Sequence, residues 1–334
     1  MTLFSRFFAL VGLAALLAVA APPLAEAQVA PRESTVTEDD LFRALGSEGV
    51  TGRGTIPDAG AGTLIRPENR DWAAVQGQWL HSLSIWAVVG TLAVLLLFFL
   101  IRGRIRIDAG PSGRTILRFN TVERFAHWLL ASTFIVLALT GLNLIIGKTV
   151  ILPLVGESAF GTISAWGKLA HNYLAWPFML ALVMVFLLWV IHNIPSPLDW
   201  QWIKRGGGLF QRGVHPPARK FNAGQKVIFW TVVLGGAAMS WTGVMLMFPS
   251  ELASAADWQF YQVTHALVAA GMSALVIAHI YIGSVGMEGA FDAMGSGEVD
   301  ENWAKEHHSL WVEEMKVEAD KSRAREAAAA TPAE

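Results

Sequence analysis

No cysteine occurs among the 334 residues of this chain. The absence excludes disulfides, iron–sulfur clusters held by thiolates, c-type haem attachment and cysteine-based zinc sites on this chain. A nucleotide-binding glycine pattern is missing as well. Any metal chemistry therefore has to use the nine histidines.

Charged residues are scarce too. Asp, Glu, Lys and Arg make up 16% of the chain, whereas 53% of it is hydrophobic. This balance is too apolar for an ordinary soluble domain and indicates an integral membrane protein. We expect contact with membrane lipid and no nucleic-acid partner.

The N-terminus has the features of a secretory signal peptide. One Arg precedes an apolar stretch, and the small-residue site "AEA" ends at Ala27, so residues 1–27 are expected to be removed. An uncleaved signal anchor is the alternative, and it would leave the next segment on the same exported side. Residues 28–78 are polar and rich in Gly and Pro, which predicts an extended periplasmic segment.

Five apolar runs are long enough to cross a membrane. They lie at about 79–101, 122–147, 167–193, 224–248 and 259–287. Lys and Arg collect in cytoplasmic loops, and here they fill the loops after the first and third runs, while loop 148–166 holds only Lys148 and loop 249–258 holds none. We therefore expect a periplasmic mature N-terminus and a cytoplasmic C-terminus.

The last apolar run contains two histidines, His265 and His279, fourteen residues apart. On a helix they are separated by about 21 Å and differ by about 40° in direction. They share one face at two depths, a spacing suited to two haems, one in each leaflet.

Two such sites need two further histidines at matching depths. His127 lies near the cytoplasmic end of the second run, and His171 lies near the periplasmic end of the third. The depths pair His171 with His265 and His127 with His279. Both axial positions of each iron would then be filled, which favours electron transfer over oxygen or substrate binding.

Two alternatives to haem ligation stay open for these histidines. A proton-coupled histidine-relay transporter or a structural membrane anchor would also place histidines within spans. His192, at the cytoplasmic end of the third run, competes with His127, which we prefer because it lies deeper. We interpret the remaining four as solvated surface histidines: His81, His215, His307 and His308.

From about residue 114 to 316 the chain resembles the gamma subunits of respiratory formate dehydrogenases, which are membrane cytochromes b. The segments that carry the resemblance are "RFNTVERFAHW", "HNIPSP", "FNAGQKVIFW", "HALVAAG", "IAHIYIG" and "NWAKEHHSLW". The histidine pattern alone is shared with cytochrome b subunits of nickel–iron hydrogenases. "FNAGQK", "HNIP" and "HHSLW" are more specific to the formate dehydrogenase subunits.

The resemblance implies an all-α membrane protein with two haem b groups ligated by His127, His171, His265 and His279. It implies a four-helix haem-binding bundle at 114–290, followed by a cytoplasmic tail at 291–334. This chain adds a transmembrane helix at 79–101 before the bundle.

The resemblance also implies a quinone site, for menaquinone or ubiquinone, at Asn222 and Gln225 of the "NAGQK" motif. These two residues are equally suited to capping the fourth helix. Arg124, one turn before His127, could bind a haem propionate or serve only as a positive-inside anchor.

The implied function is that of the quinone-reducing subunit of formate dehydrogenase in a bacterial inner membrane. Its partners would be an iron–sulfur beta subunit and a molybdenum- or tungsten-containing alpha subunit that oxidises formate. The resemblance implies that electrons enter at the site of His171 and His265, cross to that of His127 and His279, and reduce quinone near Asn222. The alternatives are a hydrogenase cytochrome b and the non-haem histidine-relay transporter.

Overall fold

The computed structural model describes residues 79–211, 213–248 and 255–329. The expected signal peptide (1–27) and periplasmic segment (28–78) lie outside these residues, and the rest forms a unit from Leu80 onward. Five helical segments of this unit are long and apolar enough to cross a membrane. They are His81–Arg102, Thr121–Val150, Leu152–Trp189, Ala223–Met247 and Asp257–Gly286.

The first span is built from α4 (His81–Ile85), the π-helical η2 (Trp86–Gly90) and α5 (Thr91–Arg102). It ends at Gly103, whose φ of 68° is readily available only to glycine. This first span contacts the last span, Asp257–Gly286. Its first helix, α4, also contacts the second span, Thr121–Val150.

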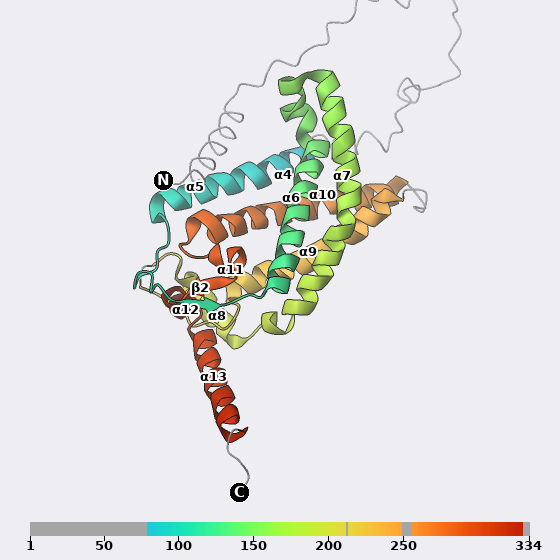
Figure 1. The fold of residues 1–334 in the computed structure, drawn as a ribbon. Helices are drawn as coiled ribbons and strands as arrows, with labels where there is room; N and C mark the ends of the chain where they lie inside the picture. The colour runs from blue at the N-terminus through green and yellow to red at the C-terminus, as the bar shows by residue number, and fades with distance from the viewer. Residues whose placement is uncertain (1–78, 212, 249–254, 330–334) are drawn as a thin grey trace, which may run out of the picture. The chain divides into compact units, whose positions relative to one another are not determined.

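The remaining spans are α6 (Thr121–Val150), α7 (Leu152–Trp189), α9 (Ala223–Met247) and α10 (Ala255–Tyr281), the last continued by the π-helical η6 (Ile282–Gly286). α6 packs along α7, α9 packs along α10, and α7 contacts α9 (Figure 1). The unit thus contains two helical hairpins that meet through α7 and α9.

The expected loop at 148–166 is wrong, because helices occupy nearly all of it. α7 begins at Leu152, and Pro153 lies in its first turn, where the missing N–H of proline has no cost. Ile151 alone separates α6 from α7. Inside the part of α7 that lies in this stretch, only Gly156 has non-helical backbone angles, with φ 78°.

A polar layer covers the end of the unit where α6 begins and α7 ends. In it, β1 (Thr115–Leu117) pairs antiparallel with β2 (Glu298–Asp300), with Ile116 opposite Val299. The short helices around this ribbon are η3 (Ile191–Asn193), α8 (Pro197–Lys204), η4 (Gly206–Gly208), α11 (Asp292–Gly295) and α12 (Glu301–His307). Part of the expected tail at 291–334 is therefore folded against loops from earlier in the chain, and α13 (Ser309–Ala329) follows it.

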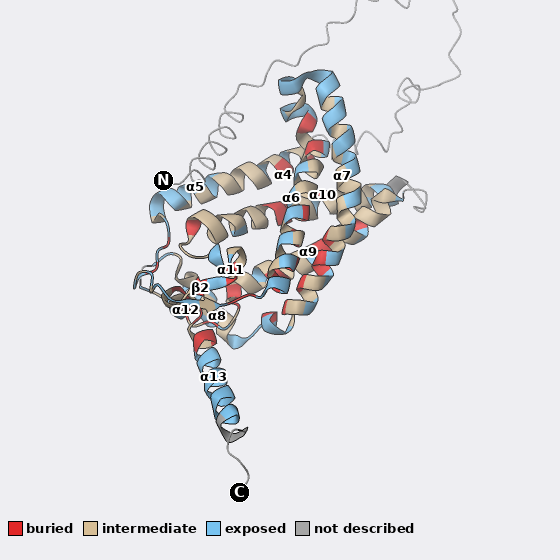
Figure 2. Ribbon diagram, in the orientation of Figure 1, coloured by how far each residue is buried: buried red, intermediate tan, exposed pale blue. Residues whose placement is uncertain are grey.

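Burial differs between the two parts of the unit. Only 6–28% of the residues in the most apolar window of each span are buried inside the protein, as expected for helices whose other apolar side chains contact lipid. In Figure 2 buried residues gather at the lower ends of α6 and α7 and at the start of α13. Phe119, Val299 and Trp303 of the polar layer are buried and belong to one core cluster with residues of α6 and α7.

Arg118 lies at the centre of that core, only 4% exposed. Its guanidinium carbon lies 5.0–5.4 Å from the ring centres of three aromatic side chains, a cation–π arrangement. Those side chains are Phe119, Trp303 and Trp311. Arg118 Nη2 also donates to Lys220 O at 2.6 Å and lies 3.0 Å from His308 Nε2. Burial lowers the pKa of Arg118 to about 9, so it stays charged at neutral pH.

The interpretation of His308 as a solvated residue is wrong, because it is 0% exposed. Since Arg118 can only donate, Nε2 of His308 accepts, and Nδ1–H donates to Arg219 O at 2.7 Å. His307 is half-buried as well. Their polar sequence surroundings suggested a surface position for both histidines, but the C-terminal segment folds back over Arg118 and Phe119.

We expect this layer to lose stability as the pH falls below about 6.5, the ordinary pKa of histidine. Burial holds the pKa of His308 well below that value and lowers the pKa of His307 to about 4. Unfolded chains therefore take up protons that folded chains do not, and stability falls by up to about 1.4 kcal/mol per pH unit for each histidine. The measurement is hydrogen exchange of residues 301–312 between pH 7.5 and 5.

The matched variant for this experiment is His308→Gln. A glutamine amide can donate to Arg219 O and accept from Arg118, but it does not titrate. The slope of stability against pH should be shallower in this variant. An identical slope in both proteins would contradict the assignment of the pH dependence to His308.

Candidate functional site: two histidine pairs

The structure brings the four predicted histidines together as two pairs. The ring centres of His127 and His279 are 6.3 Å apart, and so are those of His171 and His265. α10 supplies one member of each pair, α6 supplies His127 and α7 supplies His171. These are the partners that depth and helix face predict.

The pair of His171 and His265 has a hydrogen-bond partner on each imidazole. Thr140 Oγ1 lies 2.8 Å from His171 Nδ1, and Thr242 Oγ1 lies 2.8 Å from His265 Nδ1. Each threonine hydroxyl donates its hydrogen to a backbone carbonyl of its own helix, Val136 O or Ala238 O, both at 2.7 Å. The hydroxyl oxygen therefore accepts from Nδ1–H, which leaves Nε2 unprotonated and able to ligate a metal.

A glycine follows each of these threonines, and the imidazole packs against it. A Cβ at Gly141 would lie 3.4 Å from His171 Cε1, and a Cβ at Gly243 would lie 3.3 Å from His265 Cε1. Larger side chains would push the rings away. The Thr–Gly dipeptide thus forms the same cradle twice, once on α6 and once on α9.

The pair of His127 and His279 lacks such partners. Nδ1 of His127 is buried, and neither imidazole makes a hydrogen bond within the described part of the chain. The two pairs therefore differ in the surroundings of their outer nitrogens.

The remaining histidines lie elsewhere. His192 is exposed in η3, beyond the end of α7, and does not join a pair. His81 Nε2 lies 3.0 Å from Thr149 Oγ1, and His215 Nε2 lies 3.0 Å from Asp108 Oδ2. His81 therefore forms a hydrogen bond with Thr149 near the end of α6 and has no histidine partner for metal ligation among the described residues.

Asn222 and Gln225 form the capping box at the start of α9. Asn222 Oδ1 accepts from Gln225 N, and Gln225 Oε1 accepts from Asn222 N, both at 3.0 Å. The capping role is confirmed. It uses the two side-chain oxygens, while the side-chain NH₂ groups make no hydrogen bond to any described residue.

Arg124 lies one turn before His127 on α6. Its Nε donates to Met294 O at 3.3 Å and its Nη2 donates to Gly295 O, so it ties α6 to α11. Nη1 makes no hydrogen bond to the described residues. Its position is explained by this packing without a propionate.

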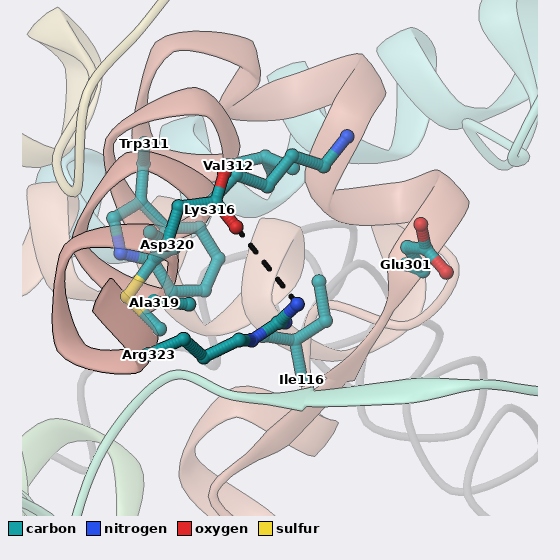
Figure 3. Close-up of a pocket in the computed structure, with 9 residues that line it drawn as sticks. Ile116, Glu301, Trp311, Val312, Lys316, Ala319, Asp320 and Arg323 are labelled. Carbon is teal, nitrogen blue, oxygen red and sulfur yellow. Dashed lines mark ion pairs between the residues drawn. The ribbon is translucent and has the colours of Figure 1, made fainter. Parts of the chain in front are cut away.

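A pocket between β1, α12 and α13 lies apart from these side chains. It measures about 330 Å³. Figure 3 shows Trp311, Lys316 and Arg323 around it, with an ion pair between Asp320 and Arg323. None of the predicted site residues lines this pocket.

Comparison with known proteins agrees with the histidine geometry. A family model described as prokaryotic cytochrome b561 matches residues 118–297, more than half of the chain. The chain belongs to the prokaryotic cytochrome b561 family. Cytochromes b hold haem b, and the five apolar helices of this family member make it a multi-pass membrane protein.

Three curated relatives of this cytochrome b561 family protein carry related names. It is 27% identical over 218 residues to the cytochrome b556(Fdn) subunit of the nitrate-inducible formate dehydrogenase of Escherichia coli K12, an alignment that covers 62% of this chain and 95% of the relative. It is 24% identical over 210 residues to the E. coli K12 formate dehydrogenase cytochrome b556(fdo) subunit, covering 62% and 96%. A formate dehydrogenase cytochrome b556 subunit from Haemophilus influenzae is 27% identical over 212 residues, covering 61% and 87%.

The geometry of both pairs fits a haem iron between the imidazoles. Metal–nitrogen bonds of about 2 Å and about 1.1 Å from each nitrogen to its ring centre add up to about 6 Å, close to the observed 6.3 Å. Among the described residues, no three His, Asp or Glu side chains gather around a metal-ion position. Two protein ligands are too few for a zinc site but are what a porphyrin-held iron needs.

Sequence reasoning missed Thr140 and Thr242. The signal was present as the repeated Thr–Gly dipeptide in "LTGLN" and "WTGVM". Threonine in an apolar helix usually bonds its own backbone, and only the approach of a neighbouring helix shows that it also meets a histidine.

Proposed function

We propose that this chain is the cytochrome b subunit of a formate dehydrogenase and carries electrons through two haem b groups to quinone. The observation that carries the proposal is the pair of 6.3 Å imidazole spacings within a cytochrome b561 family chain. The names of the three relatives support formate as the source of electrons. Haem, when bound, supplies one-electron redox chemistry at each site.

In this proposal, His171 with His265 would hold one haem b and His127 with His279 would hold the other. With both axial positions taken by protein, neither site would bind oxygen or substrate at iron. The distribution of Lys and Arg supports a site of His171 and His265 near the periplasmic side of a bacterial inner membrane and a cytoplasmic C-terminus. The partners are an iron–sulfur subunit and a molybdenum- or tungsten-containing formate-oxidising subunit, because this chain has no cysteine to hold a cluster.

The proposal is tested by haem quantitation and a reduced-minus-oxidised spectrum of the purified chain. We expect a b-type spectrum and two haems per polypeptide, and formate-oxidising subunits should copurify from native membranes. A preparation with one haem or none would contradict the two-site proposal. Copurification with a hydrogen-oxidising enzyme instead would overturn the assignment to formate dehydrogenase.

The quinone part of the proposal rests on the start of α9. α9 and α10 form a hairpin, so the start of α9 and the His279 end of α10 lie at the same end of that hairpin. Asn222 and Gln225 have side-chain NH₂ groups that the cap leaves free to donate to quinone carbonyls. Arg124 Nη1 is the donor proposed for a haem propionate at the neighbouring site.

Asn222→Ser separates capping from quinone binding. Serine caps a helix about as well as asparagine, but it has no amide NH₂ group. We expect normal haem content and thermal stability, with quinone reduction slowed about 10-fold or more, the equivalent of one lost hydrogen bond. The measurement is the rate of haem oxidation by added quinone.

The matched control is Asn120→Ser. Asn120 caps α6 through the same capping box, with Glu123 in place of Gln225. This variant should reduce quinone at the wild-type rate. Equal rates in both serine variants and the wild type would leave Asn222 with a capping role alone.

A further inference from the structure

The two histidine pairs are built differently, although one helix supplies a member of each. Thr140 and Thr242 accept from Nδ1 of His171 and His265, whereas His127 and His279 have no acceptor for Nδ1 among the described residues. Thr140 on α6 contacts His171 on α7, the second helix of the same hairpin. Thr242 on α9 contacts His265 on α10, the second helix of the other hairpin. Two different helices, α6 and α9, thus each place a threonine hydroxyl against the pair of His171 and His265, and no described residue does so for the pair of His127 and His279.

An acceptor on Nδ1–H has two physical effects on a ligating imidazole. It fixes the tautomer in which Nε2 is free to bind iron, and it fixes the ring orientation. It also draws the proton outward and makes the imidazole more basic. A more basic ligand favours the oxidised iron and lowers the reduction potential.

The neighbouring glycines indicate that these contacts are built rather than incidental. Gly141 and Gly243 let Cε1 of each histidine approach within 3.3–3.4 Å of where a Cβ would lie. Thr242 is 1% exposed, so water cannot replace its hydroxyl. Without Thr242 the buried Nδ1–H of His265 would lose its hydrogen bond. His171 also has the Leu137 backbone as a hydrogen-bond partner, so we expect the smaller effect there.

We propose that Thr140 and Thr242 are positioning residues that set the haem of His171 and His265 at a lower reduction potential than the haem of His127 and His279. The inference rests on the proposed two-haem function and gives a structural cause for its direction. Electrons then move downhill from the first site to the second. The chain's own hydrogen bonds, and not only its partners, impose that direction.

The test is a spectroelectrochemical titration of Thr140→Val, Thr242→Val and the double variant, with haem quantitation on the same samples. Valine has nearly the shape of threonine but no acceptor. We expect two haems per chain, a lower-potential step that shifts upward in each single variant and further in the double variant, and an unchanged higher-potential step. Retained haems with both steps unmoved, or with only the higher step moved, would overturn the inference.

Two controls separate this result from general disturbance. Thr133→Val removes a buried hydroxyl of α6 whose hydrogen bonds among the described residues are to its own helix, at Leu129 O and Leu130 O, and it should move neither step. Thr140→Ser and Thr242→Ser keep the hydroxyl and should have the wild-type potential. If a valine variant loses haem, the matching serine variant should retain it. Serine variants whose potential shifts as in the valine variants would refute the role of the hydroxyl. A wild-type chain without two haems would instead refute the proposed function.

Discussion

His265→Ala should reduce the haem content of the purified chain from two per polypeptide to one. The variant removes one axial ligand of the site shared with His171, whose ring centre lies 6.3 Å away. It leaves the pair of His127 and His279 untouched, because His279 lies about 21 Å further along α10 and His127 lies on α6. The remaining haem should keep its b-type spectrum, and formate-dependent quinone reduction should fall to background.

The comparison that makes this result informative is His192→Ala. His192 is exposed beyond the end of α7 and is the residue that competes with His127 in the sequence. Its loss should leave both haems in place, while His127→Ala should remove the haem that His265→Ala retains. Two haems in His265→Ala, or one in His192→Ala, would refute the assignment of ligands.

Glu123→Ala should lower the free energy of unfolding by about 3 kcal/mol, the lower end of the range for breaking a buried ion pair. Glu123 is 6% exposed and accepts from Lys220 Nζ at 2.8 Å and from Trp189 Nε1 at 2.9 Å. It also completes the capping box of α6 by accepting from Asn120 N. Its loss leaves the Lys220 ammonium without its partner, although partial exposure of Lys220 to water limits the cost.

Thermal unfolding in detergent measures the effect, with an expected fall in Tm of roughly 5–10 °C. Glu123→Gln keeps one acceptor oxygen, enough for either the cap at Asn120 N or the Trp189 indole but not for both, so it should fall between the wild type and the alanine variant. Glu313→Ala, on the exposed face of α13, should change stability by less than about 0.5 kcal/mol. If Glu123→Ala were as mild as Glu313→Ala, the contacts of Glu123 would not be what stabilises the polar layer.

Local sequence rules predicted the spans well and their ends less well. Runs of apolar residues reveal a span because the hydrocarbon core demands them. A helix that continues past the apolar run leaves no comparable signal, and α7 therefore begins at Leu152, well before the expected residue 167. The folding of the C-terminal segment was likewise invisible, because Arg118 and His308 meet across 190 residues.

The sequence by itself determined the membrane class, the absence of thiolate chemistry and which histidines share a helix face, because composition and helical periodicity are local properties. It also predicted which histidines come together, since depth in a bilayer follows from position in a span. Tertiary structure alone decided what surrounds each imidazole, including Thr140 against His171 and Thr242 against His265. Those contacts depend on how closely and at what rotation two helices pack, which no single stretch of the chain specifies.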